Sequence, residues 1–357
     1  MESLLTITWD AGRGLDLGFF TLRYYSLLFA GGFVLGYLIM RRIFEREGIP
    51  EAKLDTLLTY VVIATVLGAR LGHVFFYQWD YYSQHLAEIP KVWEGGLASH
   101  GAAIGIIIAI IIYCRRVLHK PVLWMLDRLV ITVALAGCLI RLGNFANSEI
   151  YGQMANAQWE TVFTNPVRER IMAVYGRYLE GIEFRETDRK EVADSLIHPI
   201  YEVELQFAQG VQKDVAQKLV SRRISPYLAG LSKENTNFLI PPQELNWQID
   251  QAGVAVVEGL GIPRRPTQLY EALAYLLIFF ILARLYLLAP VRLRHGLLFG
   301  LFLILVFGFR FFIEFYKENQ VSAEQGDLLN IGQKLSIPLV VLGIFFSLRK
   351  LNNPENE

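Results

Sequence analysis

The side chains whose types could do chemistry are charged residues and histidines within long apolar stretches, where an unpaired charge costs roughly 2.5–3.5 kcal/mol or more. They are Arg23, Arg70, His73, His100, Asp127, Arg128, Arg141, Glu271, Arg310 and Glu314. A guanidinium suits phosphate because its planar fork can engage two phosphate oxygens. A histidine can accept a proton near neutral pH. The residue types therefore point to a phosphate-containing lipid and to proton transfer.

The elements that must position these side chains are membrane helices. The chain has 357 residues, of which 53% are hydrophobic and 19% charged. A membrane helix needs about 17–25 mostly apolar residues. The stretches that qualify are about 19–40, 55–77, 97–114, 122–144, 267–288, 296–316 and 333–348. We therefore predict an all-α polytopic membrane protein with seven transmembrane helices.

The basic residues between the predicted spans indicate their orientation. If the spans alternate, they fall on one side of the membrane, which should be cytoplasmic. They are Arg41, Arg42, Arg46, Lys53, Arg115, Arg116, Lys120, Arg292, Arg294, Arg349 and Lys350. The N-terminus is then outside and the C-terminus cytoplasmic. Most of the charged and histidine residues named above then lie within ~10 Å of the outer boundary, and of that set only Asp127 and Arg128 lie at the inner end.

Residues 153–264 form a long polar segment between spans four and five. Alternation places this segment outside the cytoplasm, and its stretch 200–207 alternates apolar and polar residues as a strand does. We predict an α+β extracytoplasmic (periplasmic) head domain here, with a disordered linker as the alternative. The division is 1–152 for helices one to four, 153–264 for the insertion, and 265–357 for helices five to seven.

Structural roles remain open for several of the intramembrane residues. Arg23 can extend its charge to the interface, and Arg310 with Glu314 can form an ion pair one helical turn apart. Arg70 can satisfy helix-end carbonyls, and His100 can be a core residue. The gathering of guanidiniums near one boundary favours a phospholipid headgroup there. The net charge of zero gives no electrostatic case for nucleic acid.

The most specific motif ends span four and reads Arg141-Leu-Gly-Asn-Phe-Ala-Asn-Ser-Glu-Ile-Tyr-Gly152. Gly152 permits a tight turn or a close backbone approach, and Asn144, Asn147 and Glu149 add hydrogen-bonding groups beside Arg141. This pattern closely resembles the signature of prolipoprotein diacylglyceryl transferases. Further segments resemble that family in the same order, namely 23–25, 68–72, 93–101, 266–271, 310–317 and 332–338.

The resemblance implies transfer of the diacylglyceryl group of phosphatidylglycerol to the lipobox cysteine of a prolipoprotein signal peptide. The products are a thioether-linked lipid and glycerol phosphate. The family also implies a bacterial plasma (inner) membrane, catalysis at its periplasmic face, and neither metal nor cofactor. Four departures from the family pattern stand at Ala102, Arg265, Val306 and Lys317.

The resemblance and the residue chemistry together suggest roles for the site residues. We expect Arg141 and Arg310 to stabilise the phosphate and His100 to accept the thiol proton. Glu149, Glu271 or Glu314 is an alternative base. The remaining residues are expected to contact phosphatidylglycerol or to orient the arginines that bind it. They are Tyr25, Arg70, Asn144, Glu149, Gly152, Glu271 and Glu314.

Two rival functions are less consistent with the sequence. A secondary transporter usually places polar groups near the midplane and contains repeats, and neither pattern is visible here. A seven-span sensory receptor would need a chromophore lysine in span seven, but Lys334 lies at the edge of that span.

Overall fold

The computed structural model describes most of the chain. The described ranges are 6–156, 159–193, 196–224, 226–227, 239–240, 247–249, 253–288, 294–318 and 329–349. Arg292 and Lys350, which contributed to the predicted orientation, lie outside them. Within these ranges, seven helices are long and apolar enough to cross a membrane, which confirms the predicted number.

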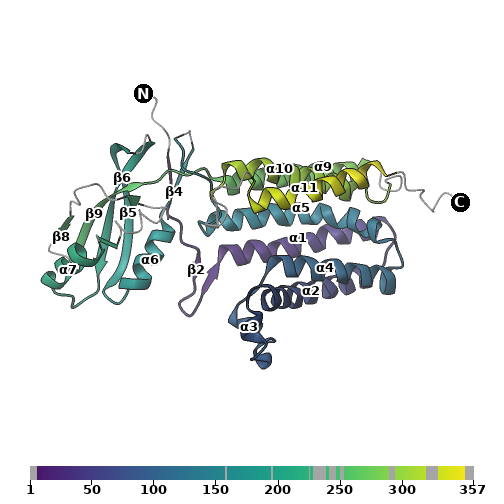
Figure 1. Ribbon diagram of the computed structural model, residues 1–357, viewed down its shortest axis with the longest axis horizontal. Coiled ribbons are helices and arrows are strands. Elements are labelled where there is room, and N and C mark those ends of the chain that lie inside the picture. Colours follow the sequence, from purple (N-terminus) through teal and green to yellow (C-terminus); the bar gives the residue numbers. More distant parts are fainter. Residues whose placement is uncertain are drawn as a thin grey trace. The chain divides into compact units, whose positions relative to one another are not determined.

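The seven long helices follow the predicted order (Figure 1). They are α1 (Tyr24–Arg46), α2 (Glu51–Tyr77), α4 (Ser99–Tyr113), α5 (Val122–Ala146), α9 (Thr267–Leu288), α10 (Leu297–Ile313) and α11 (Ile331–Leu348). A π-helical turn, η3 (Cys114–Leu118), extends α4, and a 3₁₀ turn, η5 (Glu314–Tyr316), extends α10. Between α2 and α4 lie α3 (Trp79–Tyr82), η1 (Leu86–Glu88) and η2 (Val92–Glu94).

The first helix begins later than predicted. Residues before it form an antiparallel hairpin of β2 (Gly14–Asp16) and β3 (Thr21–Arg23), so α1 starts at Tyr24 and not near residue 19. Gly18 at the hairpin tip has a φ of 83°, which a glycine adopts without steric cost. Arg23, which lies inside the predicted span 19–40, therefore belongs to β3 and precedes the helix.

The chain divides into two compact units, each assembled from three separate stretches. Unit 1 contains Met1–Leu28, Ile140–Ala272 and Phe312–Gln333, and unit 2 contains Phe29–Leu139, Leu273–Phe311 and Lys334–Glu357. Most of the length of the long helices belongs to unit 2. Unit 1 contains the signature motif, the insertion and the ends of several helices.

Glycines bring α2 and α4 close together in unit 2. A Cβ added to Gly101 would lie 2.3 Å from the Gly68 carbonyl oxygen and 2.6 Å from the Gly72 Cα. A Cβ on Gly105 would lie 2.6 Å from the Ala64 oxygen. These distances are too short for any side chain, so the Gly101–Gly105 spacing does allow close helix packing.

Unit 1 contains a mixed insertion around an antiparallel sheet (Figure 1). Its strands are β5 (Leu179–Ala193), β6 (Leu196–Phe207), β7 (Leu239–Ile240), β8 (Trp247–Ile249) and β9 (Val254–Gly261), with β6 and β9 paired at its centre. Its helical elements are α6 (Asn165–Tyr175), α7 (Lys213–Leu219) and η4 (Val220–Ile224). Separately, β1 (Ile7–Trp9) pairs in parallel with β4 (Thr161–Phe163).

The insertion has its own hydrophobic core. Tyr201, Val203 and Leu205 alternate along β6 and are all buried, which confirms the strand pattern predicted for residues 200–207. They pack in one cluster with Ile171 of α6 and Val257 of β9. A packed core of this kind is a property of a folded domain and not of a disordered linker.

Candidate active site

The signature motif combines the last turn of α5 with a strained loop. Asn147 N donates to the Gly143 oxygen at 2.9 Å, and Glu149 N donates to the Asn144 oxygen at 3.0 Å, so the chain coils tightly after the helix. Ser148 and Ile150 have φ values of 55° and 58°. Positive φ is uncommon for residues other than glycine and is a genuine outlier for β-branched isoleucine. Strain of this kind is frequent at functional sites.

Four alternating cationic and acidic side chains, Arg141, Glu271, Lys317 and Glu314, form what we term the Arg141 network. Arg141 Nη2 lies 3.2 Å from Glu271 Oε1, and Lys317 Nζ lies 3.0 Å from Glu271 Oε2. Lys317 Nζ also lies 3.1 Å from Glu314 Oε1. Glu271 is fully buried and Lys317 is 4% exposed, whereas Arg141 is 12% exposed. The opposite charges offset the desolvation that an isolated buried ion would suffer.

Glu149 is held beside Arg141 by two asparagine amides. Arg141 Nη1 donates to Asn144 Oδ1 at 3.3 Å, and Asn144 Nδ2 donates to Glu149 Oε1 at 2.9 Å. Asn147 Nδ2 donates to the same Glu149 oxygen at 3.3 Å. Gln268 of α9 donates to the Glu149 backbone oxygen at 2.8 Å. The loop carboxylate is thus oriented by both its side chain and its backbone.

The far end of the Arg141 network reaches the start of α11. Asn330 Nδ2 donates to Glu314 Oε2 at 3.2 Å. Asn330 Oδ1 accepts the Gln333 N–H at 2.8 Å, and Gln333 Oε1 accepts the Asn330 N–H at 3.1 Å. This reciprocal pair is a capping box, which satisfies two otherwise unpaired N–H groups at a helix start. The cap of α11 therefore also orients a member of the network.

Gly152 lies where no side chain fits. A Cβ there would lie 2.7 Å from both the Arg265 Cβ and the Thr267 Cγ2, and 2.8 Å from the Tyr316 oxygen. Gly152 N donates to the Arg265 oxygen at 2.9 Å. The buried Arg264 donates from Nη1 to the Gly152 oxygen at 3.1 Å and pairs with Glu318 Oε2 at 2.6 Å. The loop therefore needs glycine for a close backbone approach, as the motif suggested.

Tyr25 lies against the same motif. A Cβ on Gly143 would lie 2.8 Å from Tyr25 Cδ2, so the absence of a side chain there makes room for the tyrosine ring. Unit 1 therefore brings together most of the predicted site residues. They are Tyr25, Arg141, Asn144, Glu149, Gly152, Glu271 and Glu314.

Arg70 in unit 2 fastens the segment between α2 and α4. Its Nε, Nη1 and Nη2 donate to the backbone oxygens of Ile89, Gly95 and Glu88 at 2.7, 2.6 and 2.8 Å, and the side chain is buried. The Tyr81 hydroxyl donates to the Glu88 carboxylate at 2.8 Å, and this hydrogen bond lowers the pKa of Glu88. All three nitrogens of Arg70 thus serve the backbone, and its contact with phosphatidylglycerol stays a prediction.

His100 and Arg310 also belong to unit 2. His100 is exposed at the start of α4, with its ring 5.0 Å from the Phe76 ring and 5.6 Å from the Tyr77 ring. Arg310 is half-buried near the end of α10. Their roles as proton acceptor and phosphate ligand remain predictions, as do the roles of the residues in unit 1.

Sequence reasoning missed two residues that organise the site. Lys317 was noted only as a departure from the family, yet it bridges two buried carboxylates. Arg264 was not singled out, although its side chain is 1% exposed and bonded to Gly152. A weak signal existed for Lys317, because it follows Glu314 by three residues at the end of an apolar span. No local pattern marked Arg264, whose partners are distant in the chain.

Fold and site together define a polytopic membrane protein with a buried cation–carboxylate network beside a strained loop. Among the described residues, no three potential metal ligands gather at one place. The model of the family prolipoprotein diacylglyceryl transferase matches residues 14–349.

Three curated bacterial relatives have the name phosphatidylglycerol–prolipoprotein diacylglyceryl transferase. The relative from Tolumonas auensis is 36% identical over 341 residues, 95% of this chain and 96% of its own length. The Chloroherpeton thalassium relative is 31% identical, covering 100% of this chain and 99% of the relative. The Porphyromonas gingivalis relative is 33% identical, covering 98% and 96% respectively. The chain belongs to the prolipoprotein diacylglyceryl transferase family.

Proposed function

We propose that Arg141 binds the phosphate of phosphatidylglycerol and stabilises the charge that develops on it as the diacylglyceryl group leaves. One observation supports this most strongly. Among the described residues, only Nη1 and Nη2 of Arg141 have partners, at 3.3 and 3.2 Å, although a guanidinium carries five N–H donors. The Arg141 network thus holds a cation in a nearly dry site with donors to spare, which is the arrangement that stabilises a developing anion.

Membership of the family makes the chain a transferase that moves the diacylglyceryl group of phosphatidylglycerol to prolipoproteins. In the proposed reaction a cysteine sulfur attacks the glyceryl carbon that carries the phosphate oxygen. A carbon–sulfur bond forms, the carbon–oxygen bond breaks, and its electron pair leaves with glycerol phosphate. The thiol has a pKa near 8.5, so only a few per cent is thiolate at pH 7 and a base must take the proton.

We assign the acceptor as the lipobox cysteine of the prolipoprotein signal peptide. His100 is the first candidate for the base because imidazole titrates near neutral pH. Glu149 is the second, because two amides bind its Oε1 and leave its Oε2 without a partner among the described residues. Arg310 is the second proposed phosphate ligand.

We further propose that the site faces the periplasm of a bacterial inner membrane, with the N-terminus outside and the C-terminus cytoplasmic. If all seven long helices cross the bilayer, the chain ends lie on opposite sides. The basic residues near the C-terminal end of α1 and after the C-terminal end of α4 support a cytoplasmic location for the α1–α2 and α4–α5 connections. They are Arg41, Arg42, Arg46, Arg115, Arg116 and Lys120.

The test is diacylglyceryl transfer by purified protein, measured as mass gain on the cysteine of a lipobox peptide in the presence of phosphatidylglycerol. Arg141→Ala should lower the rate by about 10²–10³-fold, as loss of a preorganised charge-stabilising donor does, and Arg310→Ala should lower it as well. Arg284→Ala, an exposed arginine on α9, is the matched control and should retain the wild-type rate. Full activity of folded Arg141→Ala protein would contradict the proposal.

The base is tested separately. If His100 accepts the proton, His100→Asn loses transfer. Glu149→Gln then keeps the dependence of the transfer rate on pH near neutrality. Normal activity of His100→Asn would exclude His100 and leave the glutamate as the candidate.

A further inference from the structure

The hairpin of β2 and β3 presents apolar side chains at its tip. The tip residues are Leu17, Gly18, Phe19 and Phe20, and Leu15 lies on the adjoining strand. The side chain of Phe19 is 84% exposed, and those of Leu15, Leu17 and Phe20 are 47–49% exposed. The Phe19 and Phe20 rings pack edge to face, with centroids 4.9 Å apart. An apolar cluster of this kind marks an interaction surface.

The geometry of the tip is well defined. Leu17 N donates to the Phe20 oxygen at 3.1 Å, and Asp16 Oδ1 accepts the Gly18 N–H at 2.8 Å. The strands pair Gly14 with Arg23 and Asp16 with Thr21. A two-stranded hairpin alone is at best marginally stable in water, so its shape depends on what holds its base.

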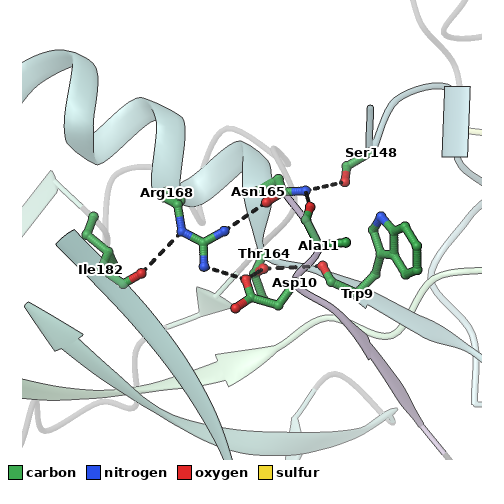
Figure 2. Close-up of polar contacts among 8 residues, drawn as sticks. All are labelled: Trp9, Asp10, Ala11, Ser148, Thr164, Asn165, Arg168 and Ile182. Atoms are coloured by element: carbon green, nitrogen blue, oxygen red, sulfur yellow. Dashed lines mark hydrogen bonds and ion pairs between the residues drawn. The ribbon is translucent and has the colours of Figure 1, made fainter. Parts of the chain in front are cut away.

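Contacts with the insertion hold that base. Figure 2 shows Arg168 of α6 directed toward Asp10, with Arg168 Nη2 2.5 Å from Asp10 Oδ1. Asn165 Nδ2 donates to the Ala11 oxygen at 2.5 Å, and Thr164 Oγ1 also bonds to Asp10.

The same clamp continues into the hairpin itself. Arg13 pairs with Glu169 of α6 at 2.5 Å, and its backbone oxygen accepts the Tyr24 N–H at 2.9 Å. The polar base of the hairpin is therefore held in place while its apolar tip is exposed, and we term the hairpin of β2 and β3 the anchor.

The hairpin leads directly along the chain into α1. Phe19 precedes Tyr24, the first residue of α1, by only five positions, and α1 is apolar enough to cross a bilayer. Its own outward side chains include Leu27 at 42% and Val34 at 60% exposure. Phenylalanine and leucine side chains are typical of surfaces that bury themselves at the headgroup–acyl boundary of a bilayer. The exposed Arg23 at the hairpin base is placed for a phosphate of the same leaflet.

We infer that the tip Leu17–Phe20 inserts into the bilayer leaflet at the N-terminal end of α1. The occupant of this apolar surface is phospholipid, not the substrate peptide or a second protein copy. Because β3 leads within two residues to Tyr25, which lies against Gly143 of the signature motif, the anchor also ties the site to the leaflet surface.

A label at the tip tests the insertion directly. Phe19→Cys is labelled with an environment-sensitive fluorophore and reconstituted in phosphatidylglycerol-containing vesicles, and Leu17→Cys serves as a second probe. The native Cys114 and Cys138 are buried, and the wild-type protein measures any background labelling. Val192→Cys is the matched control, because Val192 is 72% exposed in unit 1 but lies beside the charged Arg189, Lys190 and Glu191.

At the tip we expect a blue-shifted emission that lipid-attached doxyl groups quench and aqueous iodide does not. At Val192 the quenching pattern should be the reverse. Iodide quenching at the tip without doxyl quenching would overturn the inference. A blue shift that appears only after a lipobox peptide is added would overturn it as well, and would assign the tip to the substrate.

Discussion

Two clusters of buried charge lie on the long helices, and they differ in how fully their arginine is bonded. We term Arg128, Glu47, Trp124 and Tyr286 in unit 2 the Arg128 cluster. Arg128 Nε and Nη2 lie 3.0 and 3.2 Å from the two Glu47 oxygens, and Nη1 donates to the Trp124 oxygen at 3.1 Å. Its guanidinium also lies over the Trp124 ring, and the Tyr286 hydroxyl donates to Glu47.

Arg141 is bonded less completely. Nη1 and Nη2 each make one contact, at 3.3 and 3.2 Å, and the side chain is 12% exposed. In the Arg128 cluster each of the three guanidinium nitrogens has a protein partner, which is the arrangement of a structural ion pair. In the Arg141 network only Nη1 and Nη2 have partners among the described residues, which is why we propose Arg141 as the phosphate ligand. On the proposed roles, remaining bonding capacity would separate an intramembrane charge with a function from one that only stabilises the fold.

The largest expected effect falls on the stability of the Arg128 cluster. Arg128→Met leaves the Glu47 carboxylate without its buried partner, which should lower the free energy of unfolding by about 3–5 kcal/mol. The thermal unfolding midpoint in detergent measures this loss, while transfer per folded molecule should stay close to wild type. A stable variant with impaired transfer would reverse the roles of the two clusters.

Glu271→Gln tests the Arg141 network with nearly unchanged shape. The amide retains an oxygen for Arg141 but removes the negative charge that orients both Arg141 and Lys317. Transfer should fall by about 10–100-fold, the usual cost of losing a partner that orients a functional group. The measurement is the separate determination of kcat and KM for transfer. An unchanged kcat would show that the network does not position Arg141.

Lys317→Arg should produce the smallest change. A guanidinium keeps the positive charge between Glu271 and Glu314, so the buried carboxylates retain a cationic partner and transfer should change least of the variants considered. Lys317→Met removes the charge and should lower both transfer and stability. Equal losses in the two variants, measured by the same mass assay, would mean that Lys317 matters for its shape and not for its charge.

The sequence predicted the features that rest on local pattern. Seven apolar stretches became seven helices, and the alternation of residues 200–207 became part of β6. The hairpin before α1 was missed because Phe19 and Phe20 read as the start of an apolar span. Its fold depends on α6, whose residues lie about 150 positions away.

The same limit applies to the site. The motif from Arg141 to Gly152 could be recognised, but the bridging role of Lys317 depends on Glu271, which is remote in the chain. By residue type and apolar surroundings alone, Arg70 and Arg141 are alike, since each lies in an apolar helix. Only the structure reveals that Arg70 donates its hydrogen bonds to three backbone oxygens.

The most direct test of the central claim is to locate the donor phosphate. Phosphatidylglycerol with a photoreactive diazirine in its headgroup is crosslinked to the protein, and the modified peptides are mapped by mass spectrometry. We expect crosslinks within Arg141–Gly152 that Arg141→Ala removes. Crosslinks confined to the helix turns around Glu47 and Arg128, or unaffected by Arg141→Ala, would contradict the account.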